Sequence, residues 1–129
     1  METVAQEERN VSFEQLKKFG TRWAVLTALG LDLARQGVRV PAAMDEELKL
    51  VRMKILSGCF SPCEVGCSLS KVEGQFVAAG ASLGEEYLRP WFDLLAQAMQ
   101  GAIDPQRIAD IPALQPVATD CKFLACHCG

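Results

Sequence analysis

Apolar residues recur every three or four positions over most of the chain, which is the spacing of amphipathic helices. The first such stretch runs from Phe13 to Gln36. It opens on a capping box, with Ser12 as the N-cap and Gln15 at the third helical position, and it ends before Gly37. Its apolar stripe comprises Leu16, Phe19, Trp23, Leu26 and Leu33, with Gly30 at the remaining position. This pattern predicts a long first helix.

Two further helices follow in the middle of the chain. The second is marked by Met44, Leu48, Val51 and Ile55. Acidic residues at its start and basic residues near its end suit the helix dipole, and Gly58 closes it. The third has the best-specified start, because Ser61 can act as the cap, Pro62 occupies the first helical position and Glu64 can complete a capping box.

A fourth helix is expected from about Leu83 to Gln100, with Ser82 and Glu85 as a possible capping box. Because proline removes a backbone hydrogen bond, Pro90 predicts a kink or a break near Arg89. The helix carries a rich apolar patch made of Trp91, Phe92, Leu94, Leu95 and Met99. We expect this patch to belong to the core, with helix pairing between subunits as the functional alternative.

The C-terminal part contains fewer helix signals. A short fifth helix should begin at Pro105, whereas residues 110–120 contain Pro112 and Pro116 without a helical period and should be extended. We therefore predict an all-α fold, a small bundle of four main helices plus a short fifth helix and an extended cysteine-containing C-terminal segment, 110–129, packed on the third helix. Residues 1–129 should form one helical domain with a flexible N-terminus at 1–11.

Charge and composition exclude several classes of partner. The net charge is −3, from 13 basic and 16 acidic residues, and no basic cluster alternates with aromatic residues, so we expect no nucleic-acid partner. The most apolar stretch, Trp23 to Leu31, is far shorter than the roughly 20 residues that span a bilayer, so we expect no membrane partner. The acidic, polar N-terminus does not resemble a secretory signal. We therefore expect a cytoplasmic protein, in which clustered cysteines serve metal binding or redox chemistry.

Six cysteines provide the distinctive chemistry of the chain. One group consists of Cys59, Cys63 and Cys67, and the other of Cys121, Cys126 and Cys128. Converging thiolates bind zinc or an iron–sulfur cluster, so all six cysteines are candidate metal ligands. His127, the single histidine, is a possible additional ligand.

The third helix should present its cysteines away from the core. Cys63 and Cys67 fall opposite the apolar residues of this helix. Their face continues only with small residues, namely Ser70, Gly74, Ala78 and Ala81. We expect the segment Thr119 to Gly129 to cover this face and bring the two cysteine groups together; a dimer partner is the alternative cover. Cys63 lies at a helix N-terminus, which favours the thiolate, and it is the candidate for the strongest ligand or the most reactive thiol.

Two functions follow from these thiols. The first is an accessory or interaction module that binds zinc or an iron–sulfur cluster, with a homodimer or another protein as a possible partner. The alternative is a metal-free thiol protein whose tail is tied to the third helix by structural or redox-switched disulfides between the two groups.

An enzyme is the less favoured interpretation. With one histidine, the chain cannot supply sites that need two, and it has no phosphate-binding glycine motif. No catalytic residue is assigned, and a nucleophilic Cys63 is the remaining enzymatic alternative.

Overall fold

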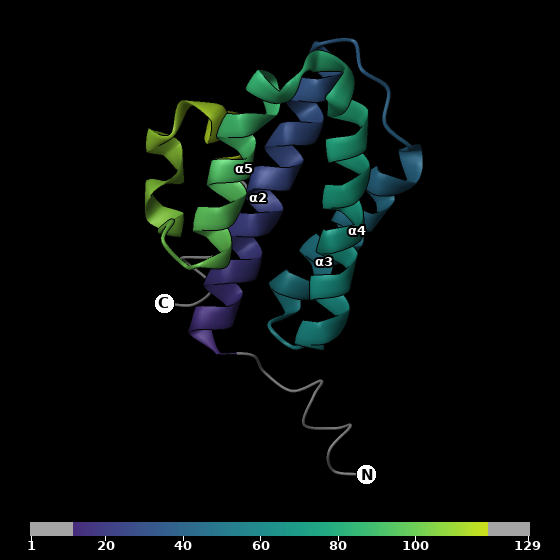
Figure 1. Ribbon diagram of the computed structural model, residues 1–129. Helices are drawn as coiled ribbons and strands as arrows, with labels where there is room; N and C mark the ends of the chain where they lie inside the picture. The colour runs from purple at the N-terminus through teal and green to yellow at the C-terminus, as the bar shows by residue number, and fades with distance from the viewer. Residues whose placement is uncertain (1–11, 119–129) are drawn as a thin grey trace.

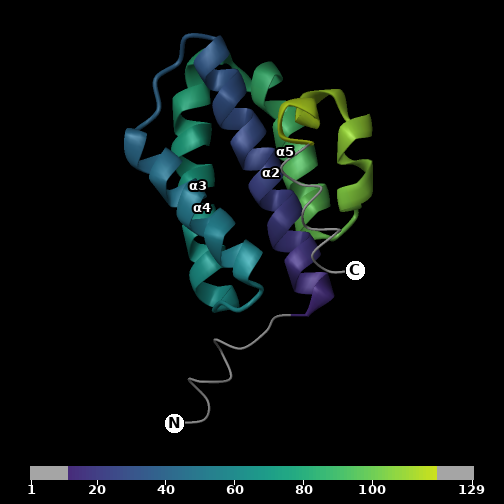
Figure 2. The same ribbon diagram turned by 180° about the vertical axis from the view of Figure 1, so that it is seen from behind.

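The long first helix is the element on which the others pack. The computed structural model describes residues 12–118. In it, α2 (Phe13–Arg35) lies between α5 (Glu85–Met99) on one side and α3 (Ala42–Ser57) with α4 (Pro62–Gly80) on the other (Figure 1, Figure 2). Three short 3₁₀ helices accompany them, η1 (Ala81–Leu83), η2 (Pro105–Asp110) and η3 (Pro112–Val117). This range contains no β-strand, and the predicted all-α bundle is confirmed.

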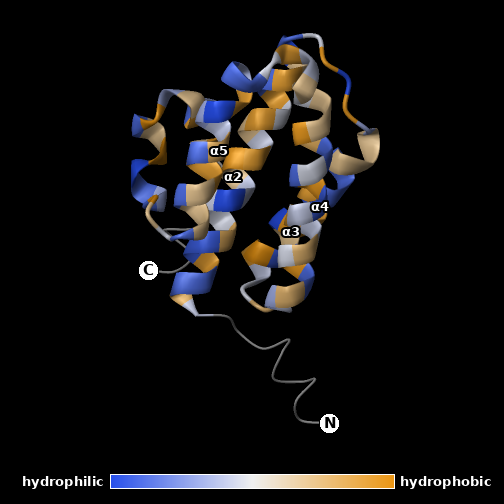
Figure 3. Ribbon diagram, viewed as in Figure 1, coloured by the Kyte–Doolittle hydropathy of each residue, from blue (hydrophilic) through white to orange (hydrophobic). Residues whose placement is uncertain are grey.

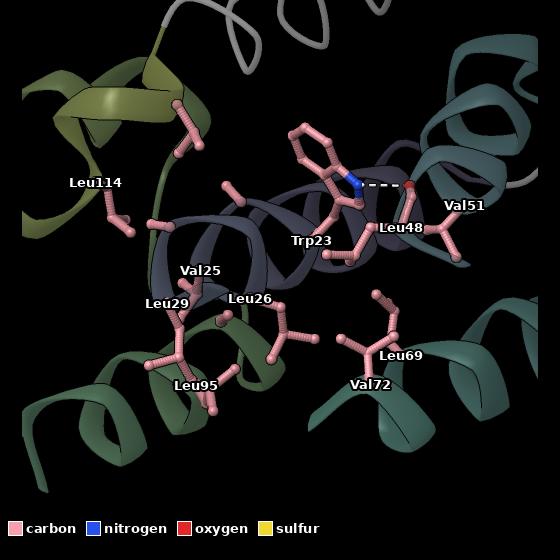
Figure 4. Packing of buried hydrophobic residues seen from close by; sticks show 14 of the residues in the cluster. Trp23, Val25, Leu26, Leu29, Leu48, Val51, Leu69, Val72, Leu95 and Leu114 are labelled. Carbon is pink, nitrogen blue, oxygen red and sulfur yellow. Dashed lines mark hydrogen bonds between the residues drawn. The ribbon is translucent and has the colours of Figure 1, made fainter. Parts of the chain in front are cut away.

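Burial explains the central place of α2. Every residue of α2 from Gly20 to Leu26 is buried, so this helix meets neighbours on all its sides. Figure 4 shows Leu26 directed toward Val72 and Leu29 toward Leu95, while the indole N–H of Trp23 donates to the Leu48 carbonyl at 2.9 Å. The other helices are amphipathic, with hydrophobic and hydrophilic positions alternating in bands along them (Figure 3). One core therefore joins all four α-helices.

A buried charge also links α2 to α4. The Nη2 atom of Arg22 donates to the Ser70 hydroxyl and to a Glu73 carboxylate oxygen, each at 3.1 Å. The Nε atom of Arg22 is buried and has no hydrogen-bond partner among the described residues. Removing either charge would leave the other poorly compensated, so this pair fixes how α4 lies against α2.

The predicted helix ends are largely confirmed. Ser12 and Gln15 form both bonds of the capping box, at 3.2 and 3.4 Å. Gly37 and Gly58 adopt positive φ angles of 80° and 69° where α2 and α3 end. At the start of α4, the Ser61 hydroxyl accepts from the Glu64 N–H at 3.3 Å, but the Glu64 carboxylate pairs with Lys54 instead of completing the box.

The fourth predicted helix differs from expectation at its start, and of the kink or break expected near Pro90 the break does not occur. The Ser82 hydroxyl donates to the Ala79 carbonyl at 3.3 Å, so it does not cap α5. Gly84, with φ of 101°, separates η1 from α5, which begins at Glu85. The helix then continues through Pro90 to Met99 without a break. Pro90 lies on the exposed side, where water can solvate the carbonyl that proline leaves without a donor.

The segment predicted to be extended is helical over its described part. The short helix expected at Pro105 is η2, and η3 then covers Pro112 to Val117. Three residues of this segment are buried, namely Ile108, Leu114 and Val117. Together with the partly buried Ile111, they recur at every third position. Three residues make one turn of a 3₁₀ helix, and proline tolerates its backbone angles, so the absence of an α-helical period was misleading here. Packing of 119–129 on α4 lies outside the described residues, as does the flexibility expected for 1–11.

The apolar patch of α5 divides between core and surface. Trp91 and Leu95 are buried and Leu94 is partly buried, which confirms core packing for these residues. Phe92 and Met99 are exposed. The apolar run 23–31 lies within α2, and none of the helices described combines the length and apolar character needed to cross a membrane.

Two glycines provide a test of this packing. A methyl group at Gly30 would approach the buried Phe76 ring to 2.9 Å, whereas one at Gly74 would meet nothing within 4 Å. We predict that Gly30→Ala destabilises the protein by about 1–3 kcal/mol, because overpacking outweighs its better helix propensity. Gly74→Ala, the matched control, should stabilise it by up to about 1 kcal/mol. Urea unfolding followed by circular dichroism measures both, and equal stabilisation would contradict the Phe76 contact.

Candidate functional site

The turn between α3 and α4 holds the first cysteine in a defined position. The Ser57 hydroxyl lies 2.6 Å from the Lys54 carbonyl oxygen and accepts from the Cys59 N–H at 3.2 Å. Phe60 is buried and meets Phe19 of α2 edge to face, with ring centroids 5.8 Å apart. Cys59 itself is exposed between these two anchors.

Cys63 and Cys67 lie on the outer side of α4, as the sequence predicts. Both are exposed free thiols, opposite the fully buried Val65 and Leu69. Four small residues that continue this face, Ser70, Gly74, Ala78 and Ala81, are also exposed. The cysteine face thus points away from the core. The segment predicted to cover it, 119–129, lies outside the described residues.

An ion pair between α3 and α4 lies beside the cysteine turn. Lys54 of α3 pairs with Glu64 of α4, and these two residues line a groove of about 290 Å³ together with Cys59, Phe60 and Ser61. The Glu64 carboxylate compensates the charge of Lys54 beside the cysteine turn. Cys59 borders this groove, whereas Cys63 and Cys67 follow one another along the small-residue face.

The described thiols do not make a complete metal site on their own. Among residues 12–118, no group of three or more cysteine, histidine, aspartate or glutamate side chains is close enough to hold a metal ion. Cys121, Cys126, Cys128 and His127 lie outside the described residues. A metal site would therefore need donors from beyond Cys59, Cys63 and Cys67.

A second candidate region lies at the other end of α2. A groove of about 730 Å³ runs between the last turns of α2, Trp91 of α5 and η3. Its walls are mostly apolar, formed by Ala28, Leu31, Ala34, Trp91, Pro112, Ala113 and Pro116, and its charged residues are Asp32 and Arg35. The hydroxyl of Tyr87, from α5, donates to Asp32 Oδ2.

Tyr87 remains a hydrogen-bond donor at this groove. Burial of the phenol, followed by its hydrogen bond to Asp32 and the charge of that carboxylate, raises the pKa of Tyr87 far above its ordinary value. Trp91 and the charge of Arg35 oppose this effect, and their influence is smaller. The phenol therefore stays protonated at physiological pH, and Asp32 Oδ2 keeps its donor.

Sequence reasoning did not find this groove. The one available signal was Asp32, which interrupts the most apolar stretch of the chain directly after Leu31. Its partner Tyr87 lies 55 residues away on another helix, and the third wall belongs to the segment predicted to be extended. Periodicity within a single helix cannot indicate such a meeting of distant elements.

Comparisons with known proteins found no match for this chain. No protein-family model matches the chain, and no curated protein or solved structure is significantly similar to it.

Proposed function

We propose that this protein binds a soft metal, as a zinc ion or an iron–sulfur cluster, through cysteines of both groups, and that it acts as an accessory or interaction module. The exposure of Cys59, Cys63 and Cys67 together at one end of α4 carries the proposal. Thiols on a solvent-facing helix end are accessible to a metal and to a second ligand-bearing segment. Since these three do not form a ligand group by themselves, the C-terminal cysteines supply the remaining donors.

Chain geometry limits which tail cysteines can take part. The described chain ends at Ala118, just after η3, which packs on α2 near Leu31, whereas the cysteine turn contacts α2 at Phe19. Phe19 and Leu31 are 12 residues apart in α2, which corresponds to about 18 Å along the helix. η3 and α4 also lie on different sides of α2 (Figure 2), which adds about 16–20 Å across two helix contacts. The required span is therefore about 25 Å.

This span favours the last two cysteines over Cys121. An extended chain advances at most about 3.5 Å per residue, so Cys121 can lie no more than about 10 Å from Ala118. Cys126 reaches about 28 Å and Cys128 about 35 Å. The proposed ligand set consequently combines Cys63 and Cys67 with Cys126 and Cys128, and Cys59 and His127 are further donors at the same end.

We predict that Cys63→Ser and Cys126→Ser each lose most of the bound metal, because removing one of four thiolates breaks the coordination shell. Cys121→Ser is the matched control and should retain metal, since Cys121 is too close to Ala118 to reach α4. Metal and acid-labile sulfide per chain are measured after anaerobic purification without chelator, and sulfide distinguishes a cluster from zinc. Full metal retention in both the Cys63 and the Cys126 variant would refute the site.

A disulfide-linked tail is the second candidate function. It is supported by the free, exposed thiols of Cys63 and Cys67 on a face of small residues, where another backbone can approach closely. A bridge from this face to Cys126 or Cys128 would close a loop of about 60 residues, which stabilises a protein by about 2–4 kcal/mol. Oxidation would then act as a latch for the tail.

The latch predicts that metal-free protein melts several degrees lower after reduction, because the loop constraint is lost from the unfolded state. Differential scanning calorimetry with and without reductant measures the shift. Thiols are counted in parallel under denaturing, non-reducing conditions. Six free thiols per chain in oxidised protein would exclude the latch.

A further inference from the structure

The groove between α2, Trp91 and η3 has the properties of a small-molecule site. Its volume of about 730 Å³ lies within the range of about 300–1,000 Å³ that is usual for ligand sites. Most of its lining is apolar, and Leu31 keeps 47% of its surface exposed there, although large aliphatic side chains are usually buried. Figure 2 shows η2 and η3 beside α2 and α5, away from α3 and α4, so this groove is separate from the cysteine face.

Asp32 determines the charge that such a ligand should carry. Its side chain is only 25% exposed, and Tyr87 holds Oδ2 by hydrogen bonding. The other oxygen, Oδ1, faces Arg35 at 3.8 Å, but the Arg35 side chain is 75% exposed. A pair this long and this solvated contributes little, so a ligand donor can displace Arg35 from Oδ1.

The backbone of α2, like Asp32, favours a positively charged ligand. Asp32 lies in the last turn of this helix, where the negative end of the helix dipole favours cations. An apolar surface next to a carboxylate suits an apolar molecule that ends in an ammonium group, and Trp91, Pro112 and Pro116 provide such a surface.

We propose that this groove binds a small apolar molecule that carries a primary ammonium group. The ammonium donates to Asp32 Oδ1, and the apolar body lies against Leu31, Trp91 and the prolines of η3. This binding site is independent of the proposed metal site, since the two occupy opposite ends of α2 and share no residue.

Phenethylamine is a suitable probe, because it is a cation at neutral pH and combines an aromatic ring with one primary amine. The chain has two tryptophans, which serve as reporter and internal control. Trp91 lines the groove, whereas the Trp23 indole donates to Leu48 in the core. In two-dimensional ¹H–¹⁵N spectra, phenethylamine should shift the Trp91 indole signal saturably, with about millimolar affinity, and leave the Trp23 signal in place.

Asp32→Asn tests the charge while keeping the shape, because the amide oxygen can still accept the Tyr87 hydroxyl. We expect this variant to bind phenethylamine about tenfold more weakly or worse. Leu31→Ala should also weaken binding through loss of apolar contact, and both variants should give folded-protein spectra. Phenylacetate, with the same ring and the opposite charge, should not bind.

The proposal would be overturned by unchanged binding to Asp32→Asn, by equal binding of phenylacetate, or by a Trp91 shift that stays linear up to about 10 mM phenethylamine. A Trp23 shift as large as that of Trp91 would also count against it, because it would indicate a general effect on the fold.

Discussion

The fold depends on one helix, α2, whose middle turns are buried on all sides. A helix that is enclosed in this way needs neighbours around its whole circumference, and α2 obtains them from α3, α4, α5 and η3. Arg22 places a charge among these apolar surroundings, and this charge is met by Glu73 and Ser70 of α4. Because a buried guanidinium is costly without such partners, this contact and the apolar side of α4 together set the rotation of α4. That rotation is what directs Cys63 and Cys67 outward.

The two candidate sites follow from the opposite ends of α2. Near its start, Phe19 contacts Phe60 and so positions the turn that carries Cys59. Near its end, Asp32 meets Tyr87, and η3 completes the apolar walls. A single rigid helix thus supports both regions without joining them. Substitutions in one region can be interpreted separately, since sites that share no partners usually contribute additively to stability.

Local patterns predicted most of the helices and one face of the site. Capping residues such as Ser12 and Ser61 act on their own first turn, so their effect is visible in a short stretch of sequence. The outward direction of Cys63 and Cys67 follows from helical periodicity alone. What could not be predicted depends on long-range packing. The Glu64 carboxylate forms an ion pair with Lys54 of α3 instead of completing the capping box with Ser61. Asp32 accepts a hydrogen bond from Tyr87 of α5.

The 3₁₀ geometry of η2 and η3 has a consequence for how the molecule opens. Such helices have poorer hydrogen-bond geometry than α-helices, so Ile108, Leu114 and Val117 hold this segment mainly through side-chain burial. Amide hydrogens here should exchange through local opening, at a lower free energy than those of α2. Opening of the segment would remove one wall of the Asp32 groove while leaving the four-helix core assembled. We therefore expect the segment from η2 to η3 to open before the four α-helices do.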